Sequence, residues 1–127
     1  MKPDDYLRNG KVYIWKEVFA VIKSKKSYPG AFANIVDKNE ITVIVDQSRF
    51  NEKDGIEVEK GWKVLTFNMV LPLGLIGFLA KVSEALADEK IPILAISAYS
   101  RDHILVKEKD LTKAIKKLED LGCVFEK

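Results

Sequence analysis

The chain has little cysteine, little histidine and no long apolar run. Its one cysteine, Cys123, excludes an internal disulfide, and with one histidine, His103, it leaves almost no material for a Cys/His metal site or catalytic pair. A membrane-spanning helix needs about 20 apolar residues, and residues 1–5 lack the apolar segment of a secretory signal. We therefore expect a cytoplasmic protein that holds no metal and does not enter a membrane.

An excess of charge of one sign is also missing, because 21 basic residues balance 19 acidic residues and leave a net charge of +2. This balance does not favour binding to nucleic acid. The glycine motifs of phosphate-binding loops, dinucleotide-binding folds and nucleophile elbows are absent, and no motif places two carboxylates for acid/base catalysis. We therefore expect neither an enzyme nor a cofactor, and no nucleic-acid partner.

The most informative stretch is residues 64–89. Its first part alternates apolar and polar residues, which predicts a strand with one buried face. After Pro72 the apolar residues recur every three or four positions, which predicts a helix from Leu75 to about Glu89. Gly74 and Gly77 flank its first turn, so backbone N–H groups at the positive end of the helix dipole are open to a carboxylate or phosphate. The same glycines also suit a tight turn and close packing of the helix on a sheet.

The remaining elements follow from local patterns on both sides of this stretch. Before it we expect a long or broken strand at residues 11–23, strands at 31–36 and 41–46, and a short strand at 56–58. After it we expect a buried strand at 93–99, a tight turn, a returning strand at 103–107, a helix capped by Asp110 and ended by Gly122, and a last strand at 123–125.

The second half therefore has the β-α-β-β-α-β order of a ferredoxin-like fold. The strand-turn-strand pattern of residues 31–46 repeats that of residues 93–107, but residues 24–30 are too few for a first helix. The predicted class is α+β, with a tail at residues 1–10 and an abbreviated copy at residues 11–60 packed on a complete ferredoxin-like copy at residues 61–127.

Four features of the second half occur together in one known family. They are the Gly61-Trp62 entry, the Leu-Gly-Leu-Ile-Gly turn at residues 73–77, the strand that follows Pro92, and Asp102 with the His-Ile-Leu-Val-Lys strand behind it. With these features the stretch resembles the second copy in small tandem ACT-domain proteins, and residues 11–60 resemble the first copy. Similar copies occur in aspartate kinase regulatory regions and in cytosolic arginine sensors.

This resemblance implies a regulatory, non-catalytic protein that binds a free amino acid at the boundary between ACT copies and signals to a downstream enzyme or regulator. The backbone of the strand-to-helix turn would hold the ligand carboxylate through residues Leu73, Gly74, Leu75, Ile76 and Gly77. Asp102, whose context resembles a ligand contact of the arginine sensors, or Glu40, placed by the internal repeat, would bind the ammonium. Asn68, on the polar face of the central strand, is a candidate contact for the ligand or a partner chain.

Structural interpretations of these residues stay open, because Asp102 and Glu40 also suit ordinary turns. The alternative function is a ligand-free dimerisation or protein-interaction module, in which strand edges left open by the abbreviated copy pair with another chain. A homodimer is expected, because pairing between two copies would cover those edges.

Overall fold

Strand β5 (Gly55–Phe67) supplies a strand to each of two units in the computed structural model, which describes residues 1–127. The helical unit consists of Met1–Trp15 and Lys63–Lys127, and the strand unit consists of Lys16–Trp62. Gly61 precedes the point at which β5 passes from one unit to the other, and its φ of 83° lies in a region that favours glycine.

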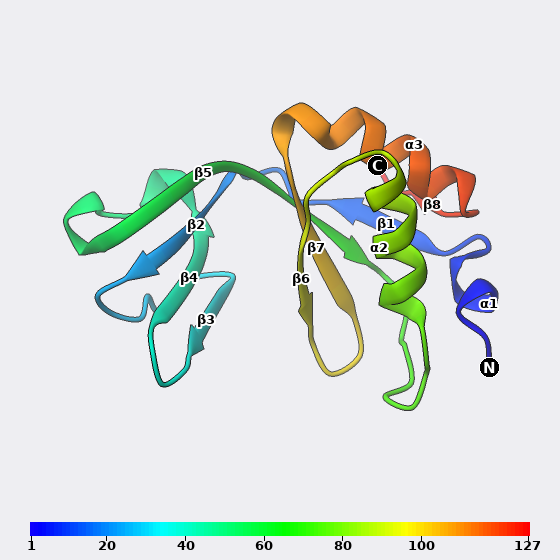
Figure 1. The fold of residues 1–127 in the computed structure, drawn as a ribbon, viewed down its shortest axis with the longest axis horizontal. Coiled ribbons are helices and arrows are strands. Elements are labelled where there is room, and N and C mark those ends of the chain that lie inside the picture. The colour runs from blue at the N-terminus through cyan, green and yellow to red at the C-terminus, as the bar shows by residue number, and fades with distance from the viewer. The chain divides into compact units, whose positions relative to one another are not determined.

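The helical unit is a mixed sheet with helices on one face (Figure 1). Its strand order is β6-β7-β5-β1-β8, and β1 runs antiparallel to β5 and parallel to β8. The other elements of the unit are α1 (Pro3–Leu7), β1 (Lys11–Ile14), α2 (Phe78–Asp88), β6 (Leu94–Ser97), β7 (Asp102–Lys107), the 3₁₀ turn η3 (Glu108–Asp110), α3 (Leu111–Asp120) and β8 (Val124–Phe125).

The succession β5-α2-β6-β7-α3-β8 confirms the predicted ferredoxin-like α+β fold. Strand β1 was not expected in this sheet, where it lies between the first and last strands of that succession. Its pairing with residues of β5 and β8 that lie far away in sequence leaves no local signature. None of the helices combines the length and the apolar composition that crossing a bilayer requires.

The core of the helical unit lies between the sheet and the helices. Leu65 and Phe67 point from β5 into this core, where the rings of Phe67 and Phe78 meet edge to face with centroids 5.2 Å apart. Each fully buried side chain of this size contributes about 1.5–3 kcal/mol through burial. Cys123 belongs to the same core, and burial raises the pKa of its thiol to about 11.

The strand unit contains no α-helix. Its order is β3-β4-β2-β5, formed by β2 (Phe19–Ser24), β3 (Ala33–Val36), β4 (Ile41–Asp46) and the first half of β5, with 3₁₀ turns η1 (Gln47–Arg49) and η2 (Glu52–Asp54). Tyr28 and Phe50, whose ring centroids are 4.8 Å apart, pack on the apolar strand residues of this unit. The Tyr28 hydroxyl donates a hydrogen bond to the carboxylate of Asp54. These two aromatic side chains therefore cover a sheet face in a unit without helices.

Several predicted boundaries differ from the structure. The long or broken strand expected at residues 11–23 is broken into β1 and β2, the second of which ends at Ser24. The expected short strand at 56–58 is part of the beginning of the 13-residue strand β5. Residues 1–10, expected to be a tail, contain α1, whose Leu7 is buried in the core of the helical unit. The structure thus groups β1 and the N-terminal residues with the second half of the chain.

Two further corrections concern α2 and β6. The helix begins at Phe78 instead of Leu75, because Gly77 has a left-handed φ of 87° and Leu75 is closed into a turn by a hydrogen bond from its N–H to the Pro72 carbonyl. Strand β6 is shorter than predicted and largely exposed, because it pairs only with β7 at the edge of the sheet.

Gly77 and Gly74 allow a matched test of this helix start. A Cβ at Gly77 requires a left-handed alanine, which costs about 1–2 kcal/mol. A Cβ at Gly74 meets no atom within 4 Å. We expect Gly77→Ala to lower the free energy of unfolding by about that amount in urea titrations, and Gly74→Ala to leave it unchanged or raise it by about 0.4–1 kcal/mol. Equal effects would contradict the assigned helix start.

Candidate functional site

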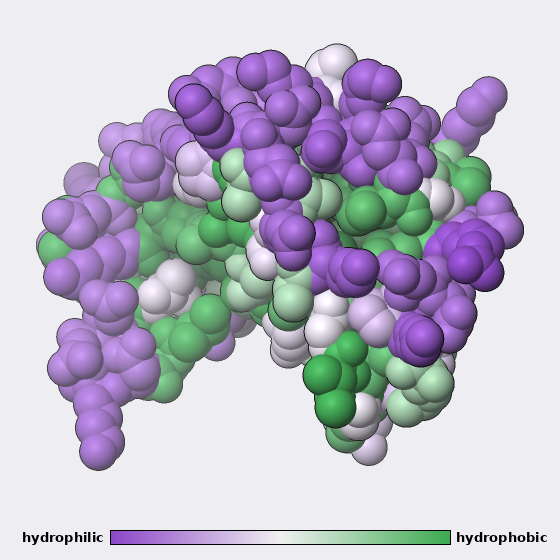
Figure 2. All heavy atoms as spheres, turned by 45° about the vertical axis from the view of Figure 1, so that its right-hand side comes forward, coloured by the Kyte–Doolittle hydropathy of each residue, from purple (hydrophilic) through white to green (hydrophobic).

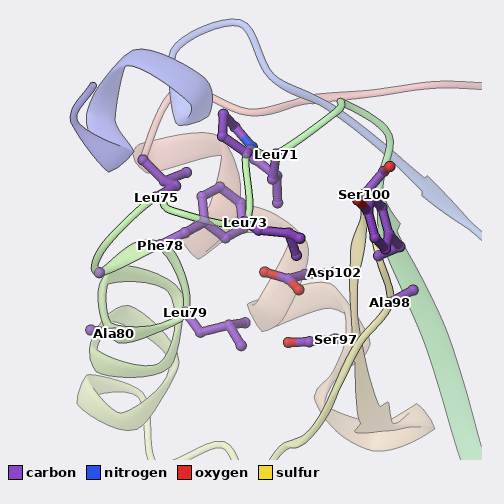
Figure 3. A pocket seen from close by; sticks show the side chains of 13 residues that line it. Leu71, Leu73, Leu75, Phe78, Leu79, Ala80, Ser97, Ala98, Ser100 and Asp102 are labelled. Carbon is purple, nitrogen blue, oxygen red and sulfur yellow. The ribbon is translucent and has the colours of Figure 1, made fainter.

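A pocket of about 360 Å³ opens in the helical unit (Figure 3). Three segments line it: the turn that leads into α2, the first residues of α2, and the end of the β6–β7 hairpin. The lining residues are Leu71, Pro72, Leu73, Leu75, Gly77, Phe78, Leu79, Ala80, Ser97, Ala98, Tyr99, Ser100 and Asp102.

The turn before α2 (residues 70–77), called here the entry turn, is fixed at both ends. Leu71 is 8% exposed and its N–H donates to the Ser100 carbonyl at 2.7 Å, which joins the turn to the hairpin. At the other end Phe78 is buried against Phe67. The residues between these anchors are more exposed, and Ile76 is 85% exposed.

The hairpin that forms the opposite wall is fixed by polar contacts. Ser97 and Asp102 are register partners on β6 and β7, and the Ala98 N–H donates to the Arg101 carbonyl at 3.0 Å. Arg101 Nε donates to Asn68 Oδ1 at 3.0 Å, and Asn68 Nδ2 donates to Glu126 Oε1 at 2.9 Å. Asn68 therefore ties the hairpin to the end of β5 and does not line the pocket.

The pocket has opposite electrostatic character on its two sides. The carboxylate of Asp102 points from β7 toward α2, and Leu79 points from α2 toward Ser97 (Figure 3). On the other side, the first helical hydrogen bond runs from Lys81 N–H to the Gly77 carbonyl, so the N–H groups of the preceding helical residues, Phe78, Leu79 and Ala80, have no partner within the helix. They lie at the positive end of the α2 dipole.

Hydrophobic side chains reach the surface among the hydrophilic ones that cover most of the face in Figure 2. Four large exposed ones belong to the entry turn and the hairpin end, namely Val70, Leu73, Ile76 and Tyr99. Two of these four, Leu73 and Tyr99, also line the pocket, so part of its wall is apolar surface open to solvent.

Some of the residues that were predicted from the sequence as ligand contacts lie together in the structure. Leu73, Leu75, Gly77 and Asp102 line the pocket, whereas Gly74 and Ile76 lie in the same turn without lining it. Glu40 belongs to the strand unit, where it closes the β3–β4 turn and lies 4.0 Å from Lys23 Nζ. A ligand role for each of these residues stays a prediction.

Sequence reasoning missed much of the lining. Leu79 and Ala80 were assigned only to a helix, and Ser97, Ala98, Tyr99 and Ser100 only to a strand and its turn. One available signal was the predicted ferredoxin-like order, because the β6–β7 hairpin follows α2 directly and returns to the same sheet.

A family model described as the ACT domain matches residues 57–120, which is half of the chain. The chain therefore belongs to the ACT domain family, as the resemblance implied. No curated protein matches the chain in sequence.

Solved structures share the fold over nearly the whole chain. A protein from Agobacterium tumefaciens is 21% identical with a TM-score of 0.78, over 94% of this chain and 95% of the other. A Vibrio cholerae protein of unknown function, described as a possible transport protein, is 15% identical with a TM-score of 0.74, over 91% and 92%. The ligand-free regulatory subunit of aspartate kinase from Thermus thermophilus is 12% identical with a TM-score of 0.67, over 91% and 97%. Similarity at these identities shows the fold alone.

His103 follows Asp102 in sequence, but its side chain contacts Thr66 of β5 and does not line the pocket. Thr66, between two core residues of β5, accepts a hydrogen bond from Trp15 Nε1 at 2.8 Å, and its Oγ1 lies 2.8 Å from His103 Nδ1. The indole N–H can only donate, so the Thr66 hydroxyl is the acceptor in its contact with Trp15, and the donor in its contact with His103 depends on the tautomer of that ring.

Burial is the main cause that lowers the pKa of His103 below 6.5, with a smaller contribution from Arg101 in the same direction and an opposing one from Asp102. The unfolded chain then binds more protons between the two pKa values, so the free energy of unfolding falls as the pH drops below about 6.5. We expect His103→Asn, which stays neutral and keeps an acceptor for Thr66, to reduce this slope in melts between pH 7.5 and 5. An unchanged slope would exclude His103 as its source.

Proposed function

We propose that this protein is a non-catalytic regulatory ACT protein that binds a free amino acid in the pocket of the helical unit. The observation that carries the proposal is the position of Asp102, whose carboxylate faces the open amino end of α2 across the pocket. A zwitterionic amino acid has an ammonium for the carboxylate and a carboxylate for the N–H groups. Membership of the ACT family supports the same interpretation.

The free energies of the individual contacts show that the ligand must be bound at both its carboxylate and its ammonium. The end of a helix contributes about 0.3–1 kcal/mol when exposed and up to about 2 when partly buried. A hydrogen bond to a charged group contributes about 1.5–3 kcal/mol. A millimolar dissociation constant requires about 4 kcal/mol, so neither pole reaches it by itself. The two together, with some apolar burial of the ligand, make millimolar or tighter binding attainable.

The regulatory part of the proposal is supported by the neighbouring structures. Among them are regulatory regions of aspartate kinase, including a separate regulatory subunit. We propose that this chain likewise acts on a downstream enzyme or regulator. Binding of an amino acid can change that partner only if it has different affinities for two arrangements of the protein.

Homodimer formation belongs to the same proposal. In the helical unit β6 pairs only with β7, so its outer edge has backbone groups free to pair with another strand. In the strand unit β3 pairs only with β4. A ligand-free interaction module would use the same edges, but the regulatory neighbours do not favour that alternative.

A screen of the twenty amino acids by thermal shift tests the proposed function. We expect at least one to raise the melting temperature with its concentration, because a ligand at a hundred times its dissociation constant stabilises the native state by about 2.7 kcal/mol. Asp102→Asn should abolish this rise and leave the unliganded melting temperature nearly unchanged, since Asp102 is partly exposed and asparagine has nearly the same shape.

Glu40→Gln is tested in the same screen, because it removes the other carboxylate that was predicted to bind the ligand ammonium. If Glu40 contributes to the ammonium site, this change weakens the response; if Glu40 serves only the β3–β4 turn, the response stays as in the wild type. A response that Asp102→Asn leaves intact would contradict the proposed site.

A further inference from the structure

We propose that the amino acid bound here has an uncharged, apolar side chain of the aliphatic class, such as leucine, isoleucine, valine or methionine. This inference rests on the proposed function and names the ligand class of the same pocket. It follows from the side chains that line the space, from their charge, and from its volume.

The walls of the pocket are mainly apolar. Leu73 and Leu75 come from the entry turn, and Leu79 comes from α2 (Figure 3). Ala98 adds a methyl group from the hairpin, and buried Phe78 closes the space beside Leu79. When a ligand side chain leaves water and packs among these groups, the free energy of binding becomes more favourable in proportion to the apolar area that is buried.

The charges of the lining argue against a charged side chain. Asp102 is the only acidic residue in the lining, which has no basic one, and the proposed function assigns Asp102 to the ligand ammonium. Lysine or arginine would need a second carboxylate, and aspartate or glutamate would need a cation. Arg101, the nearest cation in sequence, donates from its Nε to Asn68 and is not part of the lining.

The volume also favours a small ligand. About 360 Å³ lies near the lower end of the range of roughly 300–1,000 Å³ for small-molecule sites. Three lining residues, Ser97, Tyr99 and Ser100, have hydroxyl groups that can hydrogen-bond to a ligand backbone. The space therefore suits one amino acid without an attached group.

Titration calorimetry of the wild-type protein with single amino acids separates the ligand classes. Leucine and asparagine share the same charged poles and differ in the polarity of similarly branched side chains, so we expect leucine to bind on the order of ten to a hundred times more tightly. Tighter binding of lysine, arginine, aspartate or glutamate than of every aliphatic amino acid would overturn this inference and leave the proposed function standing. Failure of all twenty to bind would overturn both.

Leu79→Glu tests the wall directly. Leu79 is partly exposed, so the change is compatible with folding, and a carboxylate there should weaken leucine binding at least tenfold while strengthening lysine binding. The matched control is Val124→Glu, which places the same charge on exposed β8, outside the lining. Leucine binding that is equally strong in Leu79→Glu and in the control would overturn the inference, with circular dichroism establishing that both variants are folded.

Discussion

The packing of Phe78 on Phe67 is the constraint on which the rest of the site depends. Phe67 is the last residue of β5 and Phe78 is the first of α2, so their edge-to-face contact fixes where the helix begins relative to the strand that precedes it. The chain between them must turn back within ten residues, and left-handed Gly77 makes this possible. Because this junction holds the amino end of α2 beside the β6–β7 hairpin, the open N–H groups of the helix belong to the pocket.

The two units differ in the features that the proposed site uses. In the strand unit, residues 25–32 connect β2 to β3 without a helix, and Tyr28 with Phe50 covers the apolar strand residues. Those side chains supply burial but no row of open N–H groups and no helix dipole. The electrostatic half of an amino-acid site is therefore missing from the strand unit. The hydroxyl of Tyr28 also donates a hydrogen bond to Asp54, so this residue has a structural role in the strand unit.

The sequence predicted those parts of the fold that leave a local pattern. Alternation in β5 and three-to-four-residue spacing in α2 are set by which face each residue buries, and both are visible in a single stretch. The place of β1 between β5 and β8 depends on pairing with Phe67 and Phe125, distant in sequence, so no local pattern carried it. Asp102 was predicted as a ligand contact because its sequence context resembles that of a known family. Leu79 and Ser97 have no such context, and they line the pocket only because the fold brings α2 and the hairpin together.

Asn68 supports the pocket although it does not line it. Its amide joins Arg101 to Glu126, so the hairpin end is held by contacts that do not involve a ligand. The Leu71 N–H adds a second link, from the entry turn to Ser100. Both walls are thus positioned before any ligand arrives, and a ligand that enters a preorganised site loses less of its binding energy to the ordering of loops. A pocket with only one charged side chain needs that advantage, because it has few strong contacts with which to offset such a cost.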